Sequence, residues 1–175
     1  MRYKEIVFDV DGTLIDTEYA VLHSLQDTVC HFTGKTPEIA SLTFALGITG
    51  EDALLRLRIT DVDNALTYWE HALETYHQSI RVFDGIERLL CDLAARGYNL
   101  GIVTSKTRAE YETDFACFDI ARHFSRVVCA DDSVKHKPNP EPLLKYMEKA
   151  KCSETELLYI GDSIYDRQCA ESARC

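Results

Sequence analysis

The stretch Glu5-Ile6-Val7-Phe8-Asp9-Val10-Asp11-Gly12-Thr13 decides the fold of this 175-residue chain. Its first six residues, from Glu5 to Val10, form a short and mostly apolar run with Asp9 near the end, as expected for a strand buried in a sheet. Asp11-Gly12 follows at once and is a turn signal. In parallel sheets, ligands bind outside the carboxyl ends of the strands, so this stretch predicts both a strand and a polar site at its end.

Three further apolar runs of the same kind follow along the chain, at Leu100–Thr104, Val127–Ala130 and Leu157–Gly161. Helical patterns lie between them. They run from Ile86 to a stop at Gly97, from an N-cap at Thr107 to Phe115, and over Pro140–Ala150. Strands that alternate with helices predict an α/β fold, with a Rossmann-like parallel sheet covered by helices on both faces.

The stretch from Thr17 to about Val82 interrupts this alternation and shows no convincing strand. Apolar residues recur there with helical period, in one segment from Val21 to Phe32 and in another from Ala65 to Ile80. We therefore predict an all-helical insertion. The expected boundaries are an α/β core of residues 1–15 and 83–175 and a helical cap of residues 16–82, which leaves the sheet just after the first carboxylates.

Charge and cysteine usage narrow the class of protein. The formal net charge of −10 argues against nucleic acid or an anionic membrane as the main partner. No stretch has the length of a membrane span. The seven cysteines are scattered without a CxxC pair, which favours reduced thiols and a cytoplasmic location. We expect a small phosphorylated substrate as the partner, and a monomer or weak dimer.

The residues that follow the predicted strands carry the candidate chemistry. They are Asp9, Asp11 and Gly12; Thr104, Ser105 and Lys106; Asp131, Asp132, Lys135 and Lys137; and Asp162, Ser163 and Asp166. Clustered carboxylates need a cation, and an all-oxygen set selects a hard one such as Mg²⁺. A carboxylate can attack phosphorus, and a lysine and a hydroxyl can bind the remaining phosphate oxygens. Gly12 lets backbone amides approach an anion.

Four motifs in this order resemble those of the haloacid dehalogenase-like hydrolase superfamily. They are Asp9-Val10-Asp11-Gly12-Thr13, Val103-Thr104-Ser105, Lys137-Pro138-Asn139-Pro140 and Gly161-Asp162-Ser163-Ile164-Tyr165-Asp166. The similarity spans nearly the whole chain. The helical insertion between the first two motifs resembles the cap of the phosphoglycolate phosphatase-like branch.

The resemblance implies a role for each matching position. Asp9 is the expected nucleophile, and Asp11 the expected acid and base, with its backbone carbonyl also at the metal. Mg²⁺ is expected on Asp9, Asp11, Asp162 and Asp166, the last through water or as a neighbour of the ligands. The phosphate group is expected at Gly12, Thr104, Ser105 and Lys137. Dehalogenases of the superfamily lack the carboxylate that corresponds to Asp11, so its presence favours phosphoryl transfer.

The expected activity is Mg²⁺-dependent hydrolysis of a small phosphorylated metabolite, similar to phosphoglycolate, through an aspartyl-phosphate. Three alternatives stay open, because the cap sets the choice of substrate. The same site would serve an inorganic pyrophosphatase or a phosphosugar mutase, and a degenerate binding protein without catalysis would also retain these residues.

Several polar residues beside the motifs admit more than one interpretation. Asp16 either caps the first helix of the insertion or faces the site. Asp131 and Asp132 are expected to cap or orient the loop that follows them, and Lys135 to face solvent. For Arg56, a solvated helix face is favoured over contact with a substrate carboxylate.

The end of the chain departs from the resemblance. Relatives continue past the fourth motif with another strand and helix, whereas this sequence ends at Ser172-Ala173-Arg174-Cys175. We therefore expect the C-terminal strand and helix to be missing and Leu157–Gly161 to lie at a sheet edge, where an apolar strand invites pairing.

Overall fold

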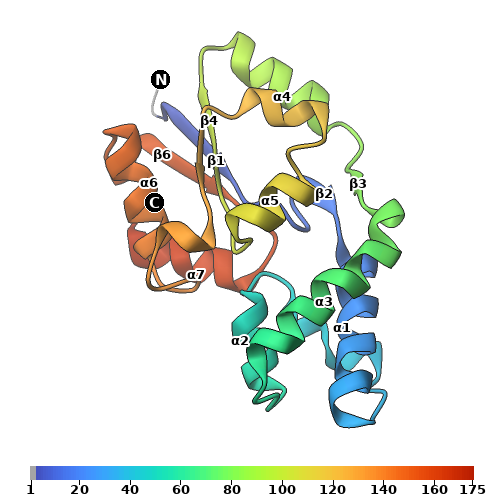
Figure 1. The fold of residues 1–175 in the computed structure, drawn as a ribbon. Coiled ribbons are helices and arrows are strands. Elements are labelled where there is room, and N and C mark those ends of the chain that lie inside the picture. The colour runs from blue at the N-terminus through green and yellow to red at the C-terminus, as the bar shows by residue number, and fades with distance from the viewer. Residues whose placement is uncertain (1–2) are drawn as a thin grey trace.

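The computed structural model describes residues 3–175, so the first two residues of the predicted core segment 1–15 lie outside it. Its centre is a parallel four-stranded sheet with the order β5-β4-β1-β6 (Figure 1). The strands are β1 (Glu5–Phe8), β4 (Asn99–Val103), β5 (Arg126–Val128) and β6 (Leu157–Ile160). All four predicted strands are confirmed, each ending one or two residues before the predicted end. β6 lies at one edge of the sheet.

Helices cover both faces of this sheet, as the alternation of elements predicts. Ile6 and Phe8 of β1 point to the face covered by α4 (Ile86–Ala95) and α5 (Arg108–Asp114). Val7 points to the opposite face, against α6 (Glu141–Ala150) and α7 (Ile164–Ala173). A strand with apolar residues on both sides is stable only when helices cover both faces of its sheet. The apolar run in β1 therefore indicates the cover on both faces that the structure shows.

Local signals set the helix ends. The Thr107 side chain accepts a hydrogen bond from the backbone N–H of Glu110, whose carboxylate accepts from the N–H of Thr107. This reciprocal capping box starts α5 where the sequence predicts. The left-handed backbone of Gly97 follows the end of α4.

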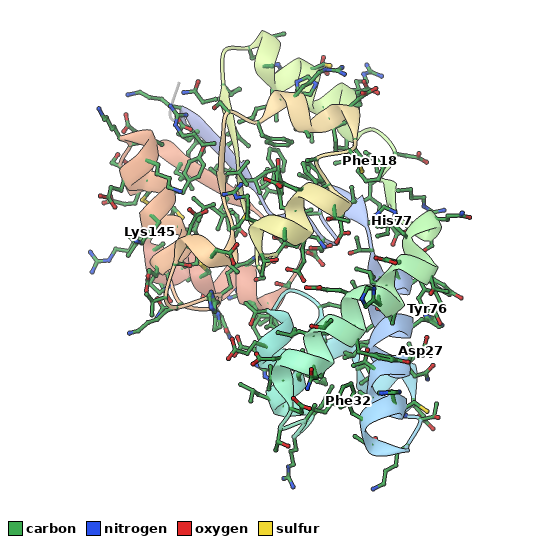
Figure 2. The ribbon with its side chains drawn as sticks, in the orientation of Figure 1. Asp27, Phe32, Tyr76, His77, Phe118 and Lys145 are labelled. Atoms are coloured by element: carbon green, nitrogen blue, oxygen red, sulfur yellow. The ribbon has the colours of Figure 1, made fainter. Side chains whose placement is uncertain are left out.

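The insertion forms a second layer of helices, and most of its buried apolar residues form a cluster of their own. It comprises α1 (Glu18–Thr33), α2 (Gly50–Arg56) and α3 (Val62–Tyr76), with 3₁₀ turns η1 (Ile39–Ser41), η2 (Thr43–Ala45) and η3 (His77–Ser79). Leu22, Leu25 and Leu54 belong to an apolar cluster distinct from those of the sheet. Tyr76 of α3 donates a hydrogen bond to Asp27 of α1 at 2.7 Å, which ties the two long helices together (Figure 2).

A short antiparallel ribbon joins the insertion to the sheet layer. β2 (Ile15–Asp16) pairs with β3 (Arg81–Val82), so the expectation of no strand up to Val82 misses β3. Two residues are too few for a period-2 pattern to show in the sequence. Asp16 accepts a hydrogen bond from Arg81 at 3.0 Å across this ribbon, and therefore fits neither role considered for it.

The remaining turns are η4 (Asp119–His123), η5 (Ala130–Asp132) and η6 (Glu154–Glu156). Within residues 3–175, none of the helices combines the length and the apolar character needed to cross a bilayer.

Candidate active site

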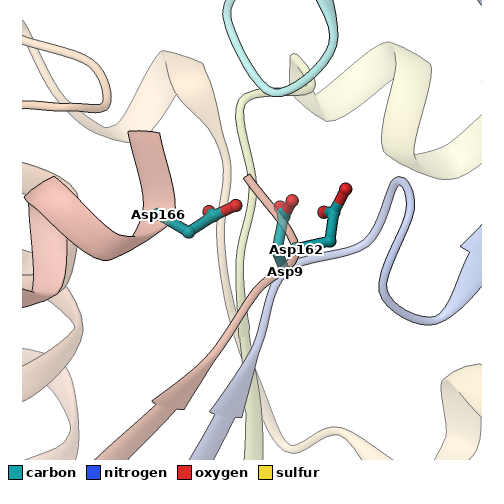
Figure 3. A group of neighbouring side chains, drawn as sticks. All are labelled: Asp9, Asp162 and Asp166. Carbon is teal, nitrogen blue, oxygen red and sulfur yellow. The ribbon is translucent and has the colours of Figure 1, made fainter. Parts of the chain in front are cut away.

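Three carboxylates meet beyond the carboxyl ends of β1 and β6. Asp9 follows β1, Asp162 follows β6, and Asp166 lies in the first turn of α7 (Figure 3). One oxygen from each of the three lies within 4.8 Å of the others. The backbone N–H of Asp9 donates to the carbonyl of Ile160 at 2.8 Å, so the sheet ladder itself holds the two strand ends together.

Lys137 is the buried counter-charge of this cluster. Its Nζ lies 2.8 Å from Asp9 Oδ1 and 2.7 Å from Asp166 Oδ1. Burial alone would lower the pKa of Lys137, but the two carboxylates outweigh it and hold the pKa above its usual range. Lys137 is therefore a fixed positive charge between the nucleophile candidate and α7.

The environment of Asp9 disfavours the ionised form of its carboxyl group. Only 2% of it is exposed. Burial raises its pKa to about 7, with Asp166 and Asp11 adding to the rise and Lys137 opposing it. One ammonium group does not balance the surrounding carboxylates, so the site favours a further cation.

Asp166 is held by the helix that it starts. Its Oδ2 accepts hydrogen bonds from the backbone N–H and the hydroxyl of Ser163, which is the N-cap of α7. Burial raises the pKa of Asp166, but Lys137 and Ser163 outweigh it and lower the pKa overall. Both oxygens of Asp166 thus have protein partners, which suits a group that orients the site.

Gly12 lies in a tight turn over Asp162. Residues 13–15 each donate a backbone hydrogen bond to the carbonyl of Val10. Gly12 has φ +74°, and a Cβ added to it would overlap the Asp162 carboxylate. Thr13 donates its hydroxyl to Asp162 Oδ1 at 3.2 Å. The turn therefore needs glycine for its backbone and for its closeness to the carboxylate.

Asp11 has a partner to which sequence reasoning gave no role. Lys106 Nζ lies 3.3 Å from Asp11 Oδ1 and 2.7 Å from Asp114 Oδ2. Lys106 and Asp114 are both buried, and His77 Nε2 lies 3.6 Å from the other oxygen of Asp114. Lys106 directly follows the Thr104-Ser105 motif. Its position beside this motif could have indicated that Lys106 lies near the site. Nothing in the sequence indicates that it pairs with Asp114.

Thr104 and Ser105, two of the residues predicted to bind phosphate, differ in their surroundings. Thr104 is buried at the end of β4, and its hydroxyl accepts from the N–H of Lys106 at 3.2 Å. Ser105 lines the same cavity as Asp9 and Asp11, but its hydroxyl donates to the carbonyl of Gly47 at 3.0 Å. Ser105 thus contacts the helical insertion as well as the site.

Loop 44–48 of the insertion rests on the sheet layer at this point. Gly47 has φ +87°, and a Cβ there would lie 2.7 Å from Ser163 Oγ. The Tyr165 hydroxyl donates to the carbonyl of Phe44 at 3.3 Å and accepts from Arg56 at 2.8 Å. Arg56 therefore forms a hydrogen bond with α7. Neither the solvated helix face nor the contact with a substrate carboxylate, the two roles considered from the sequence, includes this contact.

The other acidic and basic candidates lie outside the carboxylate cluster. Asp131 accepts from the N–H of Arg108 at 2.7 Å, and Asp132 from the N–H of Cys129 at 2.9 Å. Asp131 therefore contacts the start of α5, and Asp132 contacts the residue before η5; their expected role in the loop that follows them stays a prediction. Lys135 is exposed.

The chemistry of the cluster suits a hard divalent cation. Asp9, Asp162 and Asp166 offer only oxygen donors, and Asp162 is exposed to solvent while Asp9 is not. Magnesium favours a few carboxylate oxygens and keeps part of its water shell, so an open site with one buried and one exposed carboxylate fits it.

A cavity of about 250 Å³ lies between the sheet layer and the insertion, and Asp9 of the carboxylate cluster lines it. Asp9, Asp11, Ser105 and Lys106 line its floor, and residues of α3 line its far wall. A small molecule can therefore contact the carboxylates and the insertion at the same time.

Comparison with known proteins finds one matching family and similar hydrolases. The family model described as "Haloacid dehalogenase-like hydrolase" matches residues 6–175. The chain is 30% identical to the "Putative pyrophosphatase PpaX" of Caldanaerobacter subterraneus, over 99% of this chain and 79% of that protein. It is 27% identical to the "Pyrophosphatase PpaX" of Bacillus mycoides, over 95% of this chain and 78% of that protein.

A solved structure from Lactobacillus plantarum, described as a "putative phosphoglycolate phosphatase", has the same fold. It superposes with a TM-score of 0.90 at 30% identity, covering 99% of this chain and 84% of that one.

Proposed function

The chain belongs to the haloacid dehalogenase-like hydrolases, and on that premise we propose that it is a Mg²⁺-dependent phosphatase of a small phosphorylated metabolite. The observation that carries this proposal is the environment of Asp9. Its buried carboxylate lies at the floor of a cavity, 2.8 Å from a lysine and beside a second carboxylate suited to a metal.

In the proposed reaction, a carboxylate oxygen of Asp9 attacks phosphorus and the bond to the leaving oxygen breaks. Asp11 gives that oxygen its proton. Asp11 then takes a proton from a water molecule, which attacks phosphorus, breaks the bond to Asp9 and releases inorganic phosphate. Asp11 follows Asp9 by two residues and lines the same cavity, which supports this division of roles.

Other residues of the chain bind and orient the phosphate group. We assign this role to Lys137, to the hydroxyls of Thr104 and Ser105, and to the backbone around Gly12. Asp166 keeps Lys137 in place through the 2.7 Å ion pair. Asp9, Asp162, Asp166 and the Asp11 carbonyl would hold Mg²⁺, which when bound neutralises phosphate charge and stabilises ionised Asp9.

We also propose that residues 16–82 act as a cap over a core of residues 1–15 and 83–175. The separate apolar cluster of the insertion and its two-stranded connection support this division. Closure over the cavity would exclude bulk water from the reaction. We expect the enzyme to act in the cytoplasm, without a nucleic acid or membrane partner.

The names of the relatives keep a second candidate open. Two relatives are named pyrophosphatase PpaX, so pyrophosphate is included among the substrates to be tested. A mutase would return isomerised substrate in place of free phosphate, and a degenerate binding protein would release none.

The test is release of inorganic phosphate from a panel of small phosphate esters and pyrophosphate, with Mg²⁺ and with a chelator. We expect turnover that needs Mg²⁺ and is lost in Asp9→Asn. Asp92→Asn makes the same chemical change at an exposed position on α4 and should behave as the unmodified chain. Substantial turnover by Asp9→Asn would refute covalent catalysis by Asp9.

A further inference from the structure

We infer that this site takes a phosphate ester whose leaving group is apolar and has no anionic group of its own. The inference rests on the proposed function, because it takes the phosphate group to lie at Asp9. It concerns the opposite end of the cavity, which the leaving group would occupy.

Apolar side chains form much of the wall at that end. Leu66, Trp69 and Leu73 line it from α3, and Leu46 and Ile48 line it from loop 44–48. The polar atom of Trp69 is already used, since its Nε1 donates to the hydroxyl of Ser24 at 2.8 Å. These surfaces offer contact to hydrocarbon or an aromatic ring, but no hydrogen bonds to a charged group.

In the part of the chain that the structure describes, no lysine or arginine without a carboxylate partner faces the cavity. Among residues 3–175, Lys106 is the only lysine or arginine in its lining. Lys106 lies between two carboxylates, Asp11 at 3.3 Å and Asp114 at 2.7 Å, so its charge is already matched. His77 also lines the cavity, and its Nε2 lies 3.6 Å from Asp114, which would pair with it when it is protonated.

The far wall carries negative charge instead. Glu70 and Glu74 stand one turn apart on α3 and are both exposed in the lining. Within residues 3–175 no lysine or arginine pairs with either of them; Glu74 lies 3.8 Å from His71. Glu110 contributes less, since its carboxylate is hydrogen-bonded to Thr107 at 2.6 Å and 2.8 Å.

A second anion on the substrate would therefore meet an apolar wall and two carboxylates. Pyrophosphate and phosphoglycolate both place such an anion next to the transferred phosphate. Each would lose hydration without gaining a cation, and would be repelled by Glu70 and Glu74. An ester of an apolar alcohol avoids this cost, and an amine on that alcohol would be attracted. Such a substrate differs from the phosphoglycolate-like metabolite that the sequence motifs favour.

Trp69 makes a direct binding test possible, because it is the only tryptophan of the chain and lines the cavity. The full chain with Mg²⁺ is titrated with non-hydrolysable phosphonates while Trp69 fluorescence is recorded. We expect 3-phenylpropylphosphonate to bind at least about tenfold more tightly than phosphonoacetate or methylenediphosphonate. Equal or tighter binding of either competitor, each of which has two anionic groups, would overturn the inference.

Charge reversal provides the second arm of the experiment. Glu70→Lys and Glu74→Lys should each shift the preference toward phosphonoacetate by about fivefold or more. Glu154→Lys changes the net charge equally at an exposed position in η6, outside the cavity lining, and should leave the preference unchanged. An equal shift in all three variants would show that overall charge sets the preference, and would also overturn the inference.

Hydrolysis distinguishes failure of the inference from failure of the proposed function. If 3-phenylpropyl phosphate is cleaved with a higher kcat/KM than phosphoglycolate and pyrophosphate, the inference is supported. If phosphoglycolate or pyrophosphate is the better substrate, the inference fails and the proposed function stands. If the apolar phosphonate binds best but no ester is cleaved, the proposed function fails and the selectivity of the cavity stands.

Discussion

Asp9 illustrates at the residue scale how a site can oppose folding. It is almost fully buried among carboxylates, and its pKa is raised to about 7, mainly by burial. The folded chain therefore binds a proton at Asp9 over a pH range in which the unfolded chain, with its Asp pKa near 4, has released it. Ionisation of Asp9 consequently weakens the folded state as the pH rises from about 4 to about 7.

This sign leads to a measurable prediction for Asp9→Asn, which cannot ionise. The quantity to measure is the free energy of unfolding of Asp9→Asn minus that of the unmodified chain, with a chelator present to remove metal. This difference should rise with pH. The rise should be at most about 1.4 kcal/mol per pH unit between about pH 4 and 7. Urea unfolding at several pH values measures it, and Mg²⁺ should reduce the difference at high pH. A difference that does not change with pH would contradict this account.

Lys106 is the second case at this scale, because it neutralises Asp11 and Asp114 in a buried position. Lys106→Met should cost about 3–5 kcal/mol in free energy of unfolding, since it leaves Asp114 buried without a cation. Lys106→Met with Asp114→Leu removes both charges and should be more stable than Lys106→Met alone. Phosphate release should fall in both variants, because Asp11 loses the ammonium that orients it. Additive stability losses in the double variant would show that the pair is not coupled.

At the scale of elements, loop 44–48 is the part of the insertion that rests on the site. Its contacts are one hydrogen bond from Ser105, one from Tyr165 and the close approach of Gly47 to Ser163. A cap that docks and releases would make and break these contacts.

Gly47→Ala tests the docking of this loop, with Gly85→Ala as a matched control. Both glycines have φ +87°, but a Cβ on Gly85 would meet nothing within 4 Å, while one on Gly47 would lie 2.7 Å from Ser163 Oγ. Each substitution should cost about 1–2 kcal/mol in stability from backbone strain. Only Gly47→Ala should also lower kcat/KM, by about tenfold or more. Equal kinetics in the two variants would argue against docking at Gly47.

At the scale of the whole molecule, the apolar core of the insertion is largely, though not completely, separate from that of the sheet layer. The insertion has its own cluster, and the sheet has one cluster on each face. The two layers are linked by the two-residue strands β2 and β3 and by the contacts of loop 44–48. Ala20 and Ile80 of the insertion also pack in the sheet cluster that contains Phe8. Such an arrangement allows the insertion to unfold locally while the sheet persists.

Two equivalent core substitutions test this separation. Leu54 of the insertion and Leu143 of the sheet layer are both fully buried, so Leu54→Ala and Leu143→Ala should each cost about 2–5 kcal/mol. Amide hydrogen exchange should show that Leu54→Ala reduces protection mainly in residues 18–76. Leu143→Ala should reduce protection in the strands. Loss of protection throughout the chain in both variants would show that the two layers unfold as one unit.

The sequence by itself determined the parts of this protein that depend on neighbouring residues. An apolar run that ends in Asp9, a turn at Asp11-Gly12 and an N-cap at Thr107 are local patterns, and the structure contains each of them. In a parallel sheet every strand ends at the same edge, so the meeting of Asp9 with Asp162 also followed from the strand pattern. The two-residue strand β3 was too short to show a pattern of its own.

Only the tertiary structure decided which groups face one another across the chain. The pairing of Lys106 with Asp114 and the position of Lys137 between Asp9 and Asp166 depend on how loops are oriented over the sheet edge. The charge and apolar character of the cavity arise because α3 packs across α1 and brings Trp69 and Glu70 above the carboxylates. Such contacts depend on packing between segments distant in the sequence, which periodicity within one segment does not encode.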